Sequence, residues 1–178
     1  MIKLFVPKVY VKSFKLLSLA KLKEKGIKVL ICDIDNTLAP HDMAKPSEEA
    51  IKFLEEAKAL GFKVAVASNN TKERVATFCE GLDVFYSYSS LKPLPFVYFK
   101  VARHFGVSTS QMAMLGDQLL TDMLGANLAR VFTVLSSPLV LRDIPITKMN
   151  RKVENIVYSQ LEKKNLLKKG DYFDFFYA

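Results

Sequence analysis

Residues 28–38 most strongly limit what this chain can fold into, because they join a buried-strand pattern to two closely spaced acids. The segment reads KVLICDIDNTL, so an apolar, β-favouring run ends abruptly at Asp33 and Asp35. Such a run is typical of a strand buried on both faces of a parallel sheet. If the strand continued through the acids, both side chains would point the same way, at the carboxyl end where open α/β sheets bind ligands.

Two acids beside a buried strand end are costly unless a cation or a reaction uses them. Solvated acids that simply follow a strand are also common in loops, so this pair alone leaves both interpretations open. The choice between them depends on what the rest of the chain places at the same edge of the sheet.

Strand and helix patterns alternate along the rest of the chain. Short apolar segments bounded by glycine or polar turns indicate strands, and apolar spacings of three and four residues indicate the helices between them. The expected strands are 27–33, 62–67, 83–88, 112–115 and 131–135, and the expected helices are 47–60, 71–80, 96–105, 119–129 and 147–169. This alternation predicts an α/β, Rossmann-like fold with a five-stranded parallel sheet, right-handed crossovers and helices on both faces.

The length of 178 residues fits a single domain, 1–178, with a sizeable core. No apolar run approaches the roughly eighteen residues that suggest a membrane span. The two cysteines, Cys32 and Cys79, have neither metal-ligand spacing nor the pattern of a disulfide framework, which favours a reducing cytoplasm.

The formal net charge of +8 favours polyanionic partners, although solubility alone explains such a charge equally well. A basic amphipathic N-terminal segment, 1–26, either lies on a membrane or packs on the sheet. The C-terminal region, 147–178, combines a long helix with a tail rich in aromatic residues. That tail is expected to pack on the domain itself, on a second copy in a homo-oligomer, on another partner or on a membrane.

Polar residues follow four of the five expected strands, at the end where each strand stops. They are Asp33 and Asp35 after the first strand, Ser68 and Asn69 after the second, Lys92 after the third, and Asp117 and Asp122 after the fourth. Each group alone has an ordinary explanation as a cap or a solvated loop. Together they would gather at one edge of the sheet, which chance explains poorly and which predicts an active site there.

The four groups resemble the motifs of the haloacid dehalogenase (HAD) superfamily, which read Asp-x-Asp-x-Thr, Ser, Lys and Gly-Asp-x4-Asp. The resemblance spans nearly the whole chain and implies the strand order 5-4-1-2-3. Within the superfamily the chain is similar to the YqeG type of subclass IIIA phosphatases, related to mitochondrial phosphatidylglycerophosphatases. The segments that carry this similarity are FVP at 5–7, YV at 10–11, DIDNTL at 33–38, SNN at 68–70, GDQLLTD at 116–122 and TKMNR at 147–151. Residues 125–130 depart from the glycine-rich pattern expected there.

The resemblance implies a Mg²⁺-dependent phosphomonoester hydrolase with an aspartyl-phosphate intermediate. Asp33 would be the nucleophile and a metal ligand. Asp35 would be the general acid and base, with its backbone carbonyl on the metal. Asp117 would complete the metal ligands, and Asp122 would orient them.

The remaining motif residues would bind the phosphoryl group. Ser68 and the amide of Asn69 would hold phosphate oxygens, and Lys92 would neutralise charge on the phosphoryl group and on Asp33. Thr37 would orient Asp35 and contribute to the same substrate-binding network.

The stretches where superfamily members carry cap domains are short here, so the chain is expected to be capless. An open site suits a large phosphorylated substrate, such as a phospholipid head group, and phosphatidylglycerophosphate fits the resemblance. The enzyme would then be cytoplasmic and peripheral at the inner membrane face. A nucleic-acid end is a weaker alternative that rests on charge alone. A function of another class is a catalytically weak HAD-like binding module that docks anionic partners such as nucleic acid, ribosomes or membranes.

Overall fold

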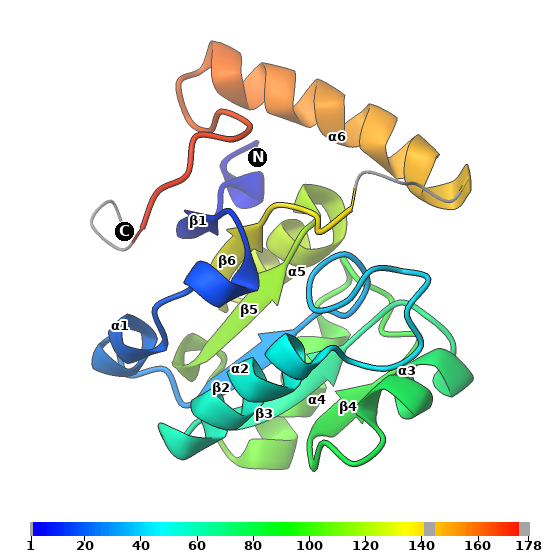
Figure 1. Ribbon diagram of the computed structural model, residues 1–178. Coiled ribbons are helices and arrows are strands. Elements are labelled where there is room, and N and C mark those ends of the chain that lie inside the picture. The colour runs from blue at the N-terminus through cyan, green and yellow to red at the C-terminus, as the bar shows by residue number, and fades with distance from the viewer. Residues whose placement is uncertain (1, 141–144, 175–178) are drawn as a thin grey trace.

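The computed structural model of the chain describes residues 2–140 and 145–174. Six parallel strands form one sheet in the order β1-β6-β5-β2-β3-β4 (Figure 1). The strands are β1 (Val9–Val11), β2 (Val29–Cys32), β3 (Lys63–Ala67), β4 (Phe85–Ser87), β5 (Met112–Gly116) and β6 (Phe132–Ser136). The predicted parallel sheet and its order 5-4-1-2-3 are confirmed as β6-β5-β2-β3-β4. The prediction of five strands was one short, because β1 adds to the edge beside β6.

The central strand β2 is buried along its whole length, as its apolar sequence predicts. Its side chains alternate between two cores. Leu30 and Cys32 face one cluster, and Val29 and Ile31 face another. This alternation explains why the strand has no polar position, since a parallel sheet covered on both faces offers none to water.

Helices cover both faces of the sheet. They are α1 (Leu19–Glu24), α2 (Glu48–Ala59), α3 (Lys72–Cys79), α4 (Phe96–Phe105), α5 (Leu124–Leu128) and α6 (Pro145–Lys163). The first three pack on one face and α4 with α5 on the other, as Figure 1 shows for α2 and α4. Side chains cap two of these helices where the sequence predicts a start, at Ser47 before α2 and Thr71 before α3.

The N-terminal segment packs on the sheet. It forms a 3-10 turn (Phe14–Leu16) and the short helix α1. Its apolar residues Phe14, Leu17 and Leu22 are buried in the core cluster that also contains β2 residues. The membrane alternative for this segment therefore loses the apolar face that it required.

Strand β1 forms from residues that carry no long apolar run, so its pattern was too short to predict. Its outer edge is covered by the C-terminal segment, because Tyr10 and Phe173 exchange both backbone hydrogen bonds, at 2.8 and 2.9 Å. Tyr172 and Phe173 also stack edge-on against the Tyr10 ring. This part of the aromatic tail packs on the domain itself, and the rest of the tail, 175–178, lies outside the described residues.

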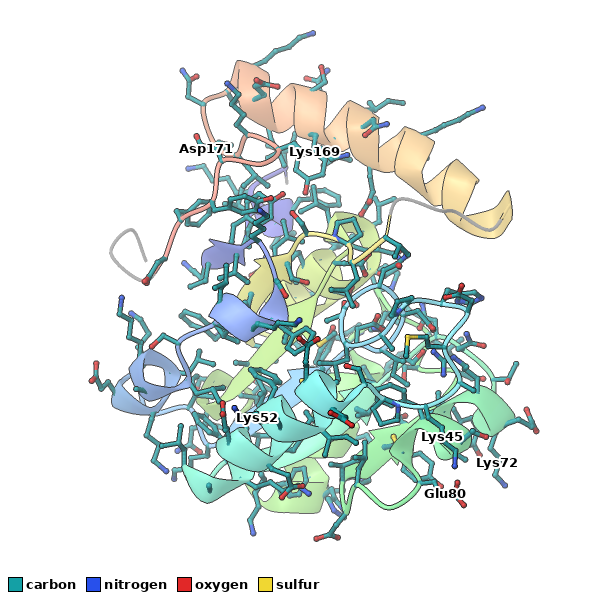
Figure 2. The ribbon with its side chains drawn as sticks, viewed as in Figure 1. Lys45, Lys52, Lys72, Glu80, Lys169 and Asp171 are labelled. Atoms are coloured by element: carbon teal, nitrogen blue, oxygen red, sulfur yellow. The ribbon has the colours of Figure 1, made fainter. Side chains whose placement is uncertain are left out.

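Helix α6 ends at Lys163, six residues before the predicted end at 169. Asn165 ends it in the left-handed conformation, with φ of 52°. The amide of Leu166 then donates to Leu161 O, and that of Asn165 donates to Glu162 O. Glycine is the usual residue at such a helix end, so the prediction placed the end before Gly170. Asparagine can also adopt the left-handed conformation that ends a helix. Figure 2 shows Lys169 and Asp171 in the turn that follows.

The sheet edge that holds the predicted site is open in the described structure. Neither 33–47, between β2 and α2, nor 80–95, between α3 and α4, contains an inserted domain. The chain is therefore capless, as predicted. Among the helices that the structure describes, none combines the length and apolar character needed to cross a bilayer.

Candidate active site

The carboxyl ends of β2, β3 and β5 meet because β2 pairs with both of the others. Asp33 follows β2 directly, and its amide donates to Leu115 O of β5 at 2.9 Å. This bond continues the ladder by one residue, so it fixes where the Asp33 side chain leaves the sheet. The side chains that follow β5 are therefore brought beside it.

Three acids share one small space at this edge. One carboxylate oxygen from each of Asp33, Asp117 and Asp122 lies within 4.8 Å of the other two. Their residues are 7, 9 and 1 % exposed. The sequence interpretation required Asp33 and Asp117 to converge, and they do.

Lys92 inserts its ammonium group into this acid group from the loop after β4. The Nζ atom lies 2.7 Å from Asp33 Oδ1 and 2.6 Å from Asp122 Oδ1. It also donates to Ala67 O of β3 at 2.8 Å. The side chain is 2 % exposed, so water contributes little to its solvation. These three acceptors fix the ammonium group between the first and last motifs.

Burial and mutual repulsion disfavour the charged form of these acids. Burial raises the pKa of Asp33 to about 7, with Asp122 adding to the rise and Lys92 opposing it. Burial, then Asp122 and Asp33, raise the pKa of Asp117 well above its usual range. Burial alone would lower the pKa of Lys92, but Asp122 and Asp33 outweigh it and the pKa is raised. One ammonium thus faces three carboxylates, and the group favours further positive charge.

The donor set fits a hard divalent cation. Asp122 is already engaged through both oxygens, because Oδ1 accepts from Lys92 and Oδ2 accepts from the Gln118 amide at 3.1 Å. Asp33 uses Oδ1 for Lys92, and Asp117 Oδ1 accepts from Thr37 at 3.4 Å. The second oxygens of Asp33 and Asp117, which follow two different strands, then remain to bind a cation. Carboxylate oxygens are the ligands that Mg²⁺ and Mn²⁺ prefer.

Asp35 lies outside this acid group. Strand β2 ends at Cys32, so the condition for Asp33 and Asp35 to point the same way is not met. The Asp35 carboxylate instead accepts from Arg74 Nη2 at 2.9 Å and Asn70 Nδ2 at 3.1 Å, with His41 Nδ1 at 3.3 Å. It remains close enough to Asp33 to help raise the pKa of that group. The acid is thus held at the mouth of the site.

Arg74 and Asn70 were not among the predicted site residues. Arg74 also donates to Ala44 O at 2.9 Å, which ties the loop before α2 to α3. A signal was present in the sequence, because Arg74 occupies the first turn of α3, where a cation opposes the helix dipole. A basic residue in that position suggests a specific anionic partner, and the structure supplies Asp35.

Thr37 is fully buried, and its hydroxyl reaches Asp117. The hydrogen bond that the structure shows for this hydroxyl is with the other side of the site, and the role of Thr37 in orienting Asp35 stays a prediction. The turn that carries it depends on Asn36, whose φ of 64° lies in the left-handed region that asparagine tolerates. Ile34 O accepts the amides of Thr37 and Leu38, which closes this turn.

Ser68 and Asn69 lie at the end of β3, as predicted. Ser68 is buried, and its Oγ accepts from the Asn70 amide at 3.1 Å. The Asn69 side chain binds the Lys92 backbone twice, accepting from its amide at 2.8 Å and donating to its carbonyl at 2.9 Å. Asn69 therefore positions the loop from which Lys92 reaches the acids.

Glu154 of α6 is a third residue that the sequence prediction missed. It is 8 % exposed, and its carboxylate accepts from the Leu119 amide at 2.6 Å and the Leu120 amide at 3.3 Å. These amides begin the π-helical turn (Leu119–Met123) that carries Asp122. In the sequence Glu154 lies on the same helix face as Val157 and Leu161, so an acid on the apolar face was the signal.

Replacing Gly116 by alanine is expected to displace the Asp122 side chain and so disturb the acid group. A Cβ atom at this position would lie 2.4 Å from both Cγ and Oδ2 of Asp122. The Asp122 side chain, which contacts Lys92, must then shift, and a misplacement of about 1 Å can lower activity on the order of 100-fold. Phosphatase assays and urea unfolding would measure the effect. In an Asp122→Gly background, which also removes the Cβ atom that would lie 2.6 Å away, the same change should cost much less stability, and equal costs in both backgrounds would contradict this contact.

Replacing Glu154 by glutamine is expected to change how stability depends on pH. Burial raises the pKa of Glu154 to about 7 from the ordinary 4.5, against the two amide hydrogen bonds. Between these values the folded chain holds a proton that the unfolded chain releases, so the free energy of unfolding falls as pH rises. Glutamine keeps the acceptor oxygen but removes this titration.

As the pH rises from 4.5 to 7, the unfolding free energy of Glu154→Gln should therefore increase relative to that of the natural chain. The expected gain is on the order of 3 kcal/mol over the full interval. Urea unfolding at pH 5 and pH 8 with a chelator present would measure it. Parallel pH profiles for the two proteins would show that Glu154 does not titrate in this interval.

Residues 8–130 match the family model of haloacid dehalogenase-like hydrolases. The chain belongs to this family, as the four motifs predicted. That stretch includes Asp33, Lys92 and Asp117 but ends before Glu154.

Two relatives have names that specify the class further. The probable phosphatase YqeG of Bacillus subtilis (strain 168) is 36% identical over 162 residues, which cover 91% of this chain and 94% of the relative. The phosphatidylglycerophosphate phosphatase 1, chloroplastic/mitochondrial, of Arabidopsis thaliana is 30% identical over an alignment covering 90% of this chain and 49% of that protein. The chain therefore spans about half of the plant protein. The chain is a HAD-family phosphatase, and this confirms the enzyme prediction over the binding module.

Solved structures show the same fold at low sequence identity. The cobalt-bound deoxy-D-mannose-octulosonate 8-phosphate phosphatase of Haemophilus influenzae matches with a TM-score of 0.54 at 18% identity, covering 82% of this chain and 95% of that one. An uncharacterised protein of Listeria monocytogenes serotype 4b matches with a TM-score of 0.51 at 19% identity, covering 71% and 99%. These similarities support the α/β fold alone.

Proposed function

We propose that this phosphatase hydrolyses phosphomonoesters with Mg²⁺ through a phosphorylated Asp33. The observation that carries the proposal is the buried Asp33 carboxylate, which contacts Lys92 at 2.7 Å through one oxygen and faces Asp117 across a cation-sized space. A carboxylate can attack a phosphate dianion only where the repulsion between them is neutralised. Lys92 supplies one positive charge, and the acid group favours another.

Mg²⁺, held by Asp33, by the Asp35 backbone carbonyl and by Asp117, would neutralise charge on the phosphoryl oxygens. Lys92, Ser68 and the amide of Asn69 would hold the same oxygens from the protein side. Asp122 keeps Lys92 in place through its 2.6 Å contact. Thr37 acts in this network through its contact with Asp117.

The reaction takes two displacements at phosphorus. First, an oxygen of Asp33 attacks phosphorus, the bond to the ester oxygen breaks, and Asp35 gives a proton to the departing alcohol. Then water attacks the phosphoryl group, Asp35 accepts its proton, and the bond to Asp33 breaks to release phosphate. Asp35 suits both steps because Arg74, Asn70 and His41 hold it at the mouth of the site.

For the substrate we propose phosphatidylglycerophosphate, presented at a bilayer. The name of the Arabidopsis relative, a phosphatidylglycerophosphate phosphatase, supports this choice. The capless edge supports it too, because a large head-group ester could cover the open site with its own bulk. The enzyme would then act as a peripheral protein on the cytoplasmic face of the membrane.

The test measures phosphate release by the purified chain from phosphatidylglycerophosphate in vesicles, with Mg²⁺ or with a chelator. We expect release only with Mg²⁺. Rapid hydrolysis of a soluble ester with none of the lipid would contradict the proposed substrate. Beryllofluoride with Mg²⁺, which mimics a phosphorylated carboxylate, should raise the melting temperature. A melting temperature unchanged by this pair would contradict the intermediate.

A further inference from the structure

Four exposed apolar side chains flank the residue that enters the acid group. Leu91, Leu94, Phe96 and Phe99 are 62, 48, 63 and 51 % exposed, and we call them the apolar rim. Lys92, between the first two, has its ammonium group inside the acid group. The rim is thus joined to the edge of the candidate active site through the backbone of Lys92.

Local hydrogen bonds hold the start of the rim in place. The Asn69 side chain binds the Lys92 backbone at 2.8 and 2.9 Å, and the Leu94 amide donates to Leu91 O at 2.8 Å. Leu91 has a φ of 56°, in the left-handed region where glycine or asparagine is less strained. A large apolar residue at a strained and exposed position points to a role outside the folded core.

The surroundings of the rim favour an anionic partner. No aspartate or glutamate occurs between Asp83 and Asp117. Helix α4 adds the exposed cations Lys100 and Arg103, four and seven residues after Phe96 and hence on its face of the helix. Aromatic and leucine side chains beside lysine and arginine are typical of segments that lie at a membrane interface. A second copy of the chain would instead bring two positively charged faces together.

We propose that the apolar rim docks the enzyme on the surface of an anionic bilayer and brings the open site to the phosphate groups of lipids. This inference rests on the proposed function, since a lipid ester must be reached at its membrane. It also replaces the N-terminal segment as the membrane contact, because Phe14, Leu17 and Leu22 of that segment are buried in the core. In Figure 1, α4 lies on the sheet face opposite α2, and its first turn adjoins the loop after β4.

Two substitutions would remove the apolar contacts and leave the site intact. Leu91→Asn suits the left-handed backbone, and Phe96→Ser removes the most exposed side chain of the rim. Leu16→Asn with Ile156→Ser is the matched control, because those side chains are 65 and 63 % exposed elsewhere on the surface. Lys100→Glu with Arg103→Glu tests the electrostatic contribution separately.

The measurement is flotation of the purified chain with vesicles of phosphatidylcholine alone or mixed with phosphatidylglycerol. The natural chain and the control should float with the anionic vesicles. The rim variant should bind them at least about tenfold more weakly, since two large apolar groups no longer enter the interface. The charge-reversal variant should lose about fivefold for each cation removed, and added salt should have a similar effect.

Hydrolysis of a soluble aryl phosphate is measured in parallel and should be the same for all of these variants. A natural chain that hydrolyses the aryl ester but does not float, or a rim variant that floats as well as the natural chain, would overturn the docking surface alone. Flotation without hydrolysis of any ester would support docking and overturn the proposed function. A dimer that the rim variant abolishes, without flotation, would show that a second copy covers the rim and would overturn the bilayer proposal.

Discussion

The Asp33→Asn variant should lose Mg²⁺-dependent hydrolysis of an aryl phosphate by at least about 10⁴-fold, the scale seen when a catalytic nucleophile is removed. Asparagine has nearly the same shape as aspartate and retains an oxygen that can accept from Lys92. It cannot form the phosphorylated carboxylate, and it offers the cation a weaker ligand. The stabilisation by beryllofluoride with Mg²⁺ should disappear together with the activity.

The fold should survive this substitution. One of three crowded acids is removed, and Lys92 retains its 2.6 Å contact with Asp122. A melting temperature at or above that of the natural chain is therefore expected in the presence of a chelator. Asp83→Asn is the matched control. Asp83 is exposed just before β4, at the end of the sheet away from the site, and its positive φ suits asparagine. Activity of Asp33→Asn comparable to this control would exclude Asp33 as the nucleophile.

Replacing Lys92 by methionine should have the largest effect on stability. Methionine fills a similar volume, but it leaves the carboxylates of Asp33 and Asp122 without their buried partner. Removing one partner of a buried ion pair typically costs about 3 to 5 kcal/mol. Urea unfolding at pH 8 with a chelator would measure the loss, and activity should fall as well because the phosphoryl group loses a cation.

The same variant predicts a dependence on pH and on a second substitution. The pKa of Asp33 is raised to about 7, so at lower pH the protonated acid needs Lys92 less and the loss of stability should shrink. Adding Asp122→Asn to Lys92→Met should restore part of the stability, because one fewer buried carboxylate is then left without a cationic partner. Lys52→Met on α2, a lysine exposed on the surface, is the control (Figure 2). A loss no larger than that of this control would contradict the buried ion pairs.

The sequence predicts the elements of this fold whose signal is local. The apolar run that ends at Asp33 identifies β2 and its place in a buried sheet, and glycine and cap residues set the ends of several helices. Strand β1 was missed because its three residues carry too short a pattern and depend on β6 and on Phe173 for their pairing. Helix α6 was overextended because asparagine only sometimes acts as a helix stop.

The candidate site was predicted at the level of its motifs, and the family resemblance implied that Lys92 lies near Asp33, but most contacts of the site residues with other elements were not predicted. Lys92 and Asp33 are 59 residues apart, and only the sheet order brings them within 2.7 Å. Arg74 and Glu154 were missed because their importance comes from partners on other elements. Each did leave a local anomaly, a cation in the first turn of a helix and an acid on an apolar helix face. Such anomalies identify residues to examine, although they cannot name the partner.

The pairing of Tyr10 with Phe173 has a consequence for how this protein behaves in solution. An uncovered edge strand can recruit a strand from another molecule, and this is a common first step in aggregation. The C-terminal segment occupies that position on β1 through two backbone hydrogen bonds. Cutting the chain before Phe173 would therefore uncover a strand edge as well as shorten a tail, and the truncated protein should precipitate more readily while its catalytic residues remain unchanged.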